Sequence, residues 1–219
     1  MKFSLAATAI CALSSTSAAA FIQRRQPTVV GTVDASIGTV QATIPAYLST
    51  IGSSVAVIKN EGSVYTALAQ AAIAAIENSA ANITAALTQA SGTIVGATTT
   101  AAGDINTRAA ILIQSEIDLL VKDVQTVVGI VQGINATVSV VHADLDATAN
   151  SLVQAEVGAL VAAIKPFVTP VQAFASAAAT FSIAASVTGL RNAVTGLNNI
   201  AAGVYGSLGV SRLGLGLGL

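Results

Sequence analysis

The residues that could do chemistry in this chain are few. The only histidine, His142, precedes Asp146 by four residues, a spacing that would place both side chains on one face of a helix. A metal site needs three or four ligands, and the only cysteine, Cys11, lies near the amino end. His142 is also the only imidazole base for a catalytic triad, and no G-x-S-x-G motif accompanies it. We therefore expect no metal, no cofactor and no catalytic residue.

A second group of ionisable side chains lies near the start of the predicted third helix. Glu116, Asp118 and Asp123 cluster there with Lys122. Paired carboxylates can act as general acid and base, but on an exposed helix face such charges are usually solvated. The group is expected to be a solvated face, and the protein is not expected to be an enzyme.

Apolar residues spaced three and four apart run through most of the chain and predict the elements that carry these groups. The stripes span residues 30–58, 69–94, 113–145, 153–181 and 187–208. This is the period of helices, since strands would show a period of two. Short connections favour antiparallel neighbours. We expect an all-α fold, an elongated up-down antiparallel bundle of about five amphipathic helices.

Turn and cap residues predict where these helices begin and end. Ser63 is expected to cap the second helix and Asp104 the third. The third helix would then run from about 104 to 149 and be about 65 Å long. Asn150 and Ser151 mark the next boundary.

Prolines and glycines add local expectations. Pro45 is expected to kink the first helix, and Pro166 and Pro170 to kink or split the fourth. The Gly129-x-x-x-Gly133 pair lets a neighbouring helix approach closely, here within a bundle.

The amino-terminal segment has the pattern of a secretory signal peptide. Lys2 precedes an apolar run, and small residues after it end in an A-x-A cleavage signature at Ala20. The dibasic pair Arg24-Arg25 follows as a processing site, with an uncleaved basic pair as the alternative. We expect a secreted protein, extracellular or in a cell wall. Its predicted parts are a signal peptide (1–20), a pro-segment ending in the dibasic site (21–25), a single bundle domain (26–209) and a disordered Leu/Gly tail (210–219).

The chain left after this processing is poor in charge. Removing Lys2, Arg24 and Arg25 leaves six basic and ten acidic residues, a net charge of −4. These sixteen charged residues are a much smaller share of the chain than the roughly 25% that is usual in soluble domains. The negative net charge argues against nucleic acid and anionic membrane surfaces as partners. Outward helix faces of Ala, Ser, Thr, Gln and Asn should adsorb readily at apolar interfaces.

The segment Pro166–Leu190 carries no charge and is flanked by Lys165 and Arg191. Threonine, serine and glutamine interrupt it, as do two prolines, whereas membrane spans are usually more apolar. We expect no integral membrane span.

Three phenylalanines repeat at sevenfold spacing within one stripe. Phe167, Phe174 and Phe181 are the only phenylalanines after Arg25. Core packing explains such a ladder, and the alternative is the wall of an acyl-chain cavity, since apolar ligand sites are lined by aromatic and aliphatic side chains. The candidates for lining a ligand are Ile164, Phe167, Val171, Phe174 and Phe181.

Two N-glycosylation sequons occur, at Asn82-Ile83-Thr84 and Asn135-Ala136-Thr137. A chain this rich in threonine yields such matches by chance. Asn82 and Asn135 are therefore candidates for glycosylation.

Taken together, the signal, the dibasic site, the cysteine-free Ala/Ser/Thr/Val-rich chain and the serial amphipathic helices over roughly Val29–Leu208 resemble the fungal hydrophobic surface binding protein family. That family includes antigenic cell-wall galactomannoproteins. The resemblance implies adsorption to hydrophobic surfaces, and related members imply a helical bundle that encloses fatty acids. It carries over no functional residue.

The sequence thus predicts a non-catalytic protein that binds hydrophobic surfaces or fatty-acid-like lipids through amphipathic helices. Cell-wall polysaccharide is a further candidate partner. The alternative is a glycosylated structural mannoprotein of the cell wall without a small-molecule ligand.

Overall fold

The protein is a bundle of helices in a computed structural model that describes residues 28–99, 105–184 and 187–207. No strand occurs among these residues, so the predicted all-α class and helical bundle are confirmed. The predicted signal peptide, pro-segment and tail lie outside the described residues, and so does Asp104. The helices are α2 (Val29–Glu61), α3 (Ala67–Thr99), α4 (Ile105–Ala110), α5 (Gln114–Asp144), α6 (Ala147–Phe181) and α7 (Thr188–Ser207).

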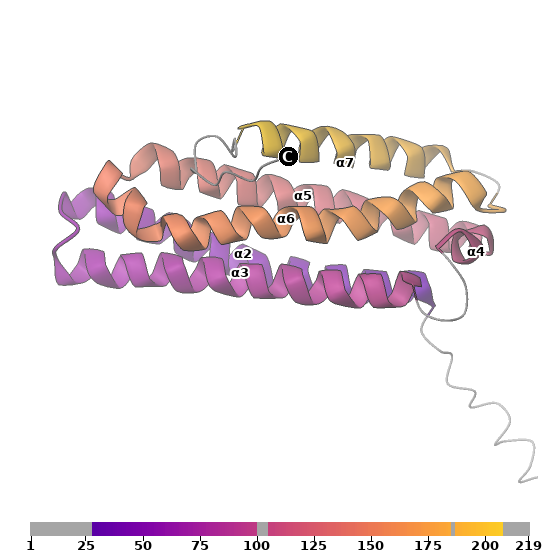
Figure 1. The fold of residues 1–219 in the computed structure, drawn as a ribbon, viewed down its shortest axis with the longest axis horizontal. Coiled ribbons are helices and arrows are strands. Elements are labelled where there is room, and N and C mark those ends of the chain that lie inside the picture. The colour runs from indigo at the N-terminus through magenta and orange to yellow at the C-terminus, as the bar shows by residue number, and fades with distance from the viewer. Residues whose placement is uncertain (1–27, 100–104, 185–186, 208–219) are drawn as a thin grey trace, which may run out of the picture.

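Two antiparallel hairpins lie side by side along the length of the molecule (Figure 1). α2 and α3 form the first hairpin and α5 and α6 the second, while α2 packs on α5 and α3 on α6. α7 lies over α5 and α6, and the short α4 lies at the end where the chain passes between the hairpins. We call the α2–α5 and α3–α6 contacts the hairpin seam.

Helices that meet across the hairpin seam run parallel to each other, whereas successive long helices run antiparallel. Lys59 Nζ and Asp144 Oδ1, at the carboxyl ends of α2 and α5, lie 2.8 Å apart. On the other pair, Ser91 late in α3 contacts Pro166 in the second half of α6. The chain therefore alternates in direction as an up-down bundle does, with its hairpins stacked in register.

One core runs the length of the bundle because each long helix turns its apolar stripe inward. Ile37 and Ile44 of α2, Ile83 of α3 and Ile134 of α5 are among the largest fully buried side chains. Such β-branched residues have low helix propensity. Burial of the stripes therefore supplies most of the stability of these helices.

The link between α2 and α3 differs from the prediction in one residue. Gly62 ends α2 in the left-handed conformation, with φ 64°, which glycine adopts without strain. The predicted cap Ser63 is wrong: its hydroxyl accepts a hydrogen bond from the Tyr65 N–H within the link, at 3.3 Å. Thr66 instead caps α3, by accepting a hydrogen bond from the Ala69 N–H at 3.1 Å.

The predicted long helix over 104–149 is wrong, because the chain leaves the helix at two places. α5 begins only after Ile113, whose N–H donates to the Glu116 carboxylate at 3.2 Å. At the other end, Leu145 has extended backbone angles and Asp146 caps α6 by accepting a first-turn N–H at 2.7 Å. A short acidic side chain that accepts from the backbone favours a helix start over a helix interior.

The predicted boundary at Asn150–Ser151 is consequently misplaced. Both residues lie in the first turns of α6. Asn150 Nδ2 donates to the Leu145 carbonyl at 2.9 Å, which satisfies an acceptor that the end of α5 leaves unpaired.

The prolines do not split their helices. α2 continues through Pro45, and α6 through Pro166 and Pro170. Pro170 has no N–H to donate to the Pro166 carbonyl, four residues earlier. Ser91 Oγ of α3 donates to that carbonyl instead, at 2.7 Å, so a hydrogen bond across the hairpin seam replaces the one lost inside the helix.

The glycine pair of α5 is used at one of its two positions. A Cβ on Gly133 would lie 3.2 Å from Leu48 Cδ1 of α2, whereas one on Gly129 would meet open space. The predicted close approach is confirmed at Gly133, where α2 and α5 meet.

Two helices, α5 and α6, are long and apolar enough to cross a membrane by length and composition. Core helices of soluble proteins pass the same test, so this is weak evidence for a span. Half of the most apolar window of α6 is buried inside the bundle, as in a core helix.

Replacing Ser91 with alanine tests the hydrogen bond to Pro166. We expect Ser91→Ala to lower the free energy of unfolding by about 0.5–1 kcal/mol, because the Pro166 carbonyl loses the hydroxyl that takes the place of the missing N–H. The matched control is Ser53→Ala, whose exposed hydroxyl donates within its own helix and should matter less. Equal urea midpoints for the two variants would contradict this account of α6.

Candidate functional site

The predicted histidine pair does not share a helix. His142 is exposed near the end of α5, whereas Asp146 caps α6, so the expectation of one common helix face is wrong. Asp144, between them, pairs with Lys59. Among the residues that the structure describes, no three His, Cys, Asp or Glu side chains are grouped to hold a metal ion.

The acidic group of α5 is only partly a solvated face. Asp118 is exposed and accepts a hydrogen bond from the Gln114 amide at 2.9 Å. Asp123 is 2% exposed, which contradicts the expectation for this residue. It lies three residues after Leu120 and four before Val127, both in the core, so the helix turns its carboxyl toward the interior.

Asp123 faces a second carboxyl across the α2–α5 contact. Burial most of all, and then the charge and hydrogen bond of Asp34, raise the pKa of Asp123 from 3.8 to about 7, while Lys122 acts weakly in the opposite sense. Asp123 Oδ2 has no hydrogen-bond partner. The pair thus holds a protonated carboxyl below neutral pH.

This acid pair is the feature that the sequence reasoning missed. A signal was present, because Asp34 lies four residues after Val30 and three before Ile37, both buried in α2. Each aspartate therefore sits at the edge of its helix's apolar stripe.

The candidate ligand-lining residues separate into two groups. Ile164, Phe167, Val171 and Phe174 are fully buried in the core. Phe181, the last residue of α6, is 49% exposed, so the ladder does not form one continuous wall. A role for the four buried residues as the wall of a ligand cavity stays a prediction.

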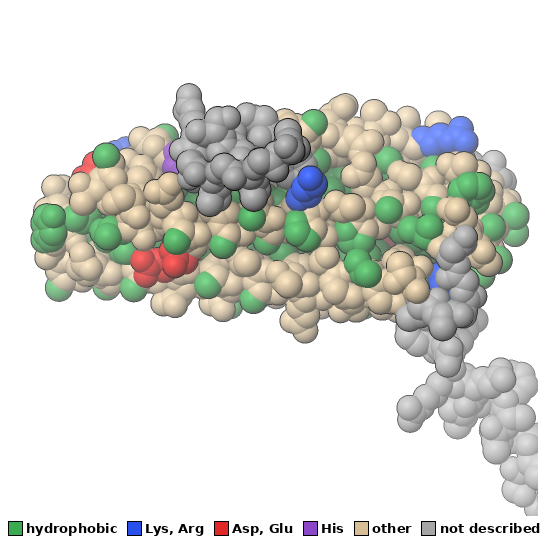
Figure 2. Space-filling view, viewed as in Figure 1, with side chains coloured by type: hydrophobic (Ala, Val, Ile, Leu, Met, Phe, Trp, Pro, Cys, Tyr) green, Lys and Arg blue, Asp and Glu red, His purple; other side chains and the backbone are tan. Residues whose placement is uncertain are grey.

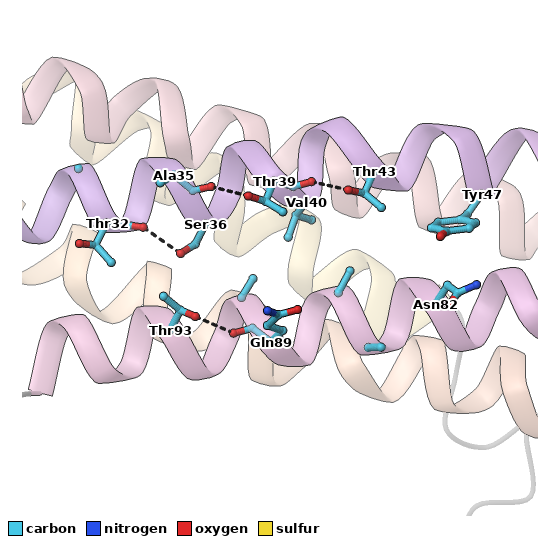
Figure 3. Close-up of a pocket in the computed structure, with 14 residues that line it drawn as sticks. Thr32, Ala35, Ser36, Thr39, Val40, Thr43, Tyr47, Asn82, Gln89 and Thr93 are labelled. Atoms are coloured by element: carbon cyan, nitrogen blue, oxygen red, sulfur yellow. Dashed lines mark hydrogen bonds between the residues drawn. The ribbon is translucent and has the colours of Figure 1, made fainter. Parts of the chain in front are cut away.

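An open groove of about 580 Å³ runs between α2 and α3 (Figure 3). Small polar side chains line it, and the Ser36, Thr39 and Thr43 hydroxyls donate to carbonyls of their own helix at 2.8–2.9 Å. Because these hydroxyl hydrogens are already donated to the helix, the hydroxyls can accept hydrogen bonds from a ligand but can donate few to it. A second open hollow, of about 680 Å³, lies over Ser91 and Pro166. Neither is lined by the ligand-lining candidates.

Large apolar side chains are exposed together at the end of the bundle where α4 lies. The α4–α5 and α6–α7 links meet there, because Ser182 Oγ donates to the Leu112 carbonyl at 3.0 Å. Hydrophobic side chains are visible at this end in Figure 2. We call the four exposed residues on and next to these links the apolar tip: Ile111, Ile113, Phe181 and Ile183.

Two members of the apolar tip were predicted to lie in buried stripes. Ile113 caps α5 and Phe181 ends α6. Both therefore lie at a helix end, where neighbouring helices no longer cover the apolar stripe. The opposite end of the bundle also exposes apolar side chains, Tyr65 and Leu68 at the start of α3.

The two sequons differ in accessibility. Asn82 is exposed on α3 and lines the α2–α3 groove (Figure 3). Asn135 is half-buried on α5, and its Oδ1 is buried without a hydrogen-bond partner. A glycan on Asn82 is compatible with the packed bundle, whereas one on Asn135 would disturb it.

No protein-family model, curated protein or solved structure matches this chain. The resemblance drawn from composition and periodicity therefore stays a prediction.

Truncating two phenylalanines of the ladder tests their different surroundings. We expect Phe174→Ala to lower the free energy of unfolding by about 3–5 kcal/mol, because it leaves a cavity in the core. Phe181→Ala should cost less than about 1 kcal/mol, since its side chain is half exposed. Denaturant titration of both variants measures the difference, and similar losses would show that the ladder is one structural unit.

Expression in a eukaryotic secretion host tests the sequons. We expect a single N-glycan, on Asn82, detected by the mass lost on enzymatic deglycosylation. Asn82→Gln should abolish that mass difference, and the control Asn135→Gln should leave it unchanged. A glycan on Asn135 of the folded protein would contradict the burial of its side chain.

Proposed function

We propose that this protein is a secreted, non-catalytic binder of hydrophobic surfaces or lipids that engages them through its amphipathic helices. The apolar tip is the observation that carries the proposal. Its outermost side chains, Ile111 and Ile183, are 70% and 77% exposed. Large exposed apolar groups gathered in one place are typical of surfaces that contact other apolar matter.

Energetics favours contact at the tip as the first step. Fully burying an isoleucine or phenylalanine side chain gains about 1.5–3 kcal/mol. The four tip residues are partly covered already, and adsorption also costs orientational freedom. The tip alone therefore supports weak, reversible contact.

Stronger binding requires the apolar stripes themselves. Their residues fill the core and would face an apolar phase if the two hairpins separated along the hairpin seam. Few charges oppose such a transfer, because charged side chains are few on the face of the bundle that Figure 2 shows. Moving a charged group out of water is costly, so a surface with few charges can approach an apolar phase closely.

The alternative is a glycosylated structural mannoprotein of the cell wall without a ligand. The exposed sequon at Asn82 supports it. Secretion is supported by the pattern of residues 1–25, and cell-wall polysaccharide is the partner that this alternative implies. The two functions differ in whether the purified protein adsorbs to apolar matter.

Removing apolar area from the tip tests the proposed function. We expect the double variant Ile111→Ser/Ile183→Ser to bind hydrophobic polystyrene beads roughly tenfold more weakly, since two exposed isoleucines no longer leave water. Its free energy of unfolding should hardly change, because both residues lie in exposed links.

The matched control is Val95→Ser/Val140→Ser, which removes exposed apolar side chains from the helix sides. This control should bind the beads nearly as the unmodified protein does. Equal weakening of the two double variants would contradict a role for the tip. Absence of adsorption by the unmodified protein would favour the structural alternative.

A further inference from the structure

The hairpin seam contains one feature at odds with an apolar core. Asp123 of α5 is buried where α5 packs on α2, and it faces Asp34 of that helix. A buried carboxylate without a positive partner is strongly disfavoured. The pair therefore makes the packing of α2 on α5 depend on a proton.

We propose that the Asp34–Asp123 pair is a pH-sensitive latch on the hairpin seam, which holds the bundle closed when it carries a proton and releases it onto apolar surfaces when it does not. The inference rests on the proposed function and concerns its regulation.

In the part of the chain that the structure describes, no cation near the pair replaces that proton. Within the described residues, the groups that act on the Asp123 carboxyl are Asp34 and Lys122, and Lys122 is exposed. α7 also packs on α5, but its one charged residue, Arg191, donates to the Ala179 carbonyl of α6 at 3.2 Å.

α6 is the remaining element that packs on α5, and it has two charged residues. Glu156 and Lys165 are both absent from the groups that act on the Asp123 carboxyl. Ionisation of Asp123 thus sets two negative charges against each other across the seam.

The sign of the pH dependence follows from the pKa of Asp123. The closed bundle holds the proton up to about pH 7, whereas the separated helices hold it only to about pH 3.8. The stabilisation is full below pH 3.8, falls as the pH rises, and is lost above pH 7. Between pH 5.5 and 8.5 the equilibrium constant for opening should rise about 30-fold, if the open form has the ordinary aspartate pKa.

The position of the pair decides which end opens. Asp34 lies near the start of α2 and Asp123 in the first third of α5, toward the end that carries the apolar tip (Figure 1). At the opposite end the seam carries attracting charges, Lys59 and Asp144. A rise in pH therefore loosens the seam at the end where an apolar surface first makes contact.

The experiment compares adsorption of the full chain to polystyrene beads at pH 5.5 and 8.5 in the unmodified protein and in Asp123→Asn. Asparagine keeps the shape of the side chain and donates a hydrogen bond to Asp34 without a titrating proton. We expect the unmodified protein to adsorb at least tenfold faster at pH 8.5, and the Asp123→Asn variant to show less than a threefold change. Asp118→Asn, an exposed aspartate of the same helix, is the control and should keep the full pH dependence.

Denaturant titration at the same two pH values provides a readout that does not depend on adsorption. The ratio of unfolding constants at pH 8.5 and 5.5 should be about 30-fold smaller in Asp123→Asn than in Asp118→Asn. Asp34→Asn, a change at a half-buried position, serves as a second variant and should also reduce the ratio.

The outcomes separate the two proposals. If the unmodified protein adsorbs at neither pH, the proposed function fails, and the titrations alone decide whether the latch exists. Adsorption that is equally fast at both pH values, with the same unfolding ratio in Asp123→Asn and Asp118→Asn, would overturn the latch and leave the proposed function standing.

Discussion

The rest of this structure depends on the burial of one apolar stripe per helix in a molecule without disulfides. The described residues contain no cysteine, and the sides of the helices carry few charges to form ion pairs. The stability must therefore come from apolar area removed from water. Each long helix is too rich in Val, Ile and Thr to be stable alone. Helix formation and packing are consequently one event.

The sequence alone was sufficient to predict the all-α class and the course of the stripes, because the helical period is repeated many times in each segment. It failed where one local interaction outweighs the period. Asp146 fits the stripe pattern of a continuing helix, yet its carboxylate caps a new one. Ser91, which belongs to the other hairpin, donates a hydrogen bond to the Pro166 carbonyl of α6. No local pattern in the sequence encodes this contact.

The candidate site was harder to predict than the fold, for a related reason. Exposure of Ile113 and Phe181 depends on where neighbouring helices end, and periodicity carries no information about that. The burial of Asp123 depends on which helix lies opposite its edge of the stripe. The stacking of parallel helices places Asp34 there, and this stacking follows from the order of the hairpins in space. An up-down bundle with the helices in simple sequential order would place other residues opposite Asp123.

The parallel stacking of the hairpins separates the contacts of this protein into two kinds. Within a hairpin, helices adjacent in sequence meet, whereas the seam joins Lys59 to Asp144 and Ser91 to Pro166, which are 85 and 75 residues apart. Closing such long loops has a greater entropic cost, so contacts of this kind tend to form late in folding. The α2–α3 hairpin, whose helices contact each other extensively, is thus a natural cooperative unit of the kind seen in native-state hydrogen exchange, whereas α5 contacts α6 less than it contacts α2. Separation of the hairpins at an apolar surface would then be the reversal of the last folding step, in which the surface takes the place of the opposite hairpin in covering the apolar stripes.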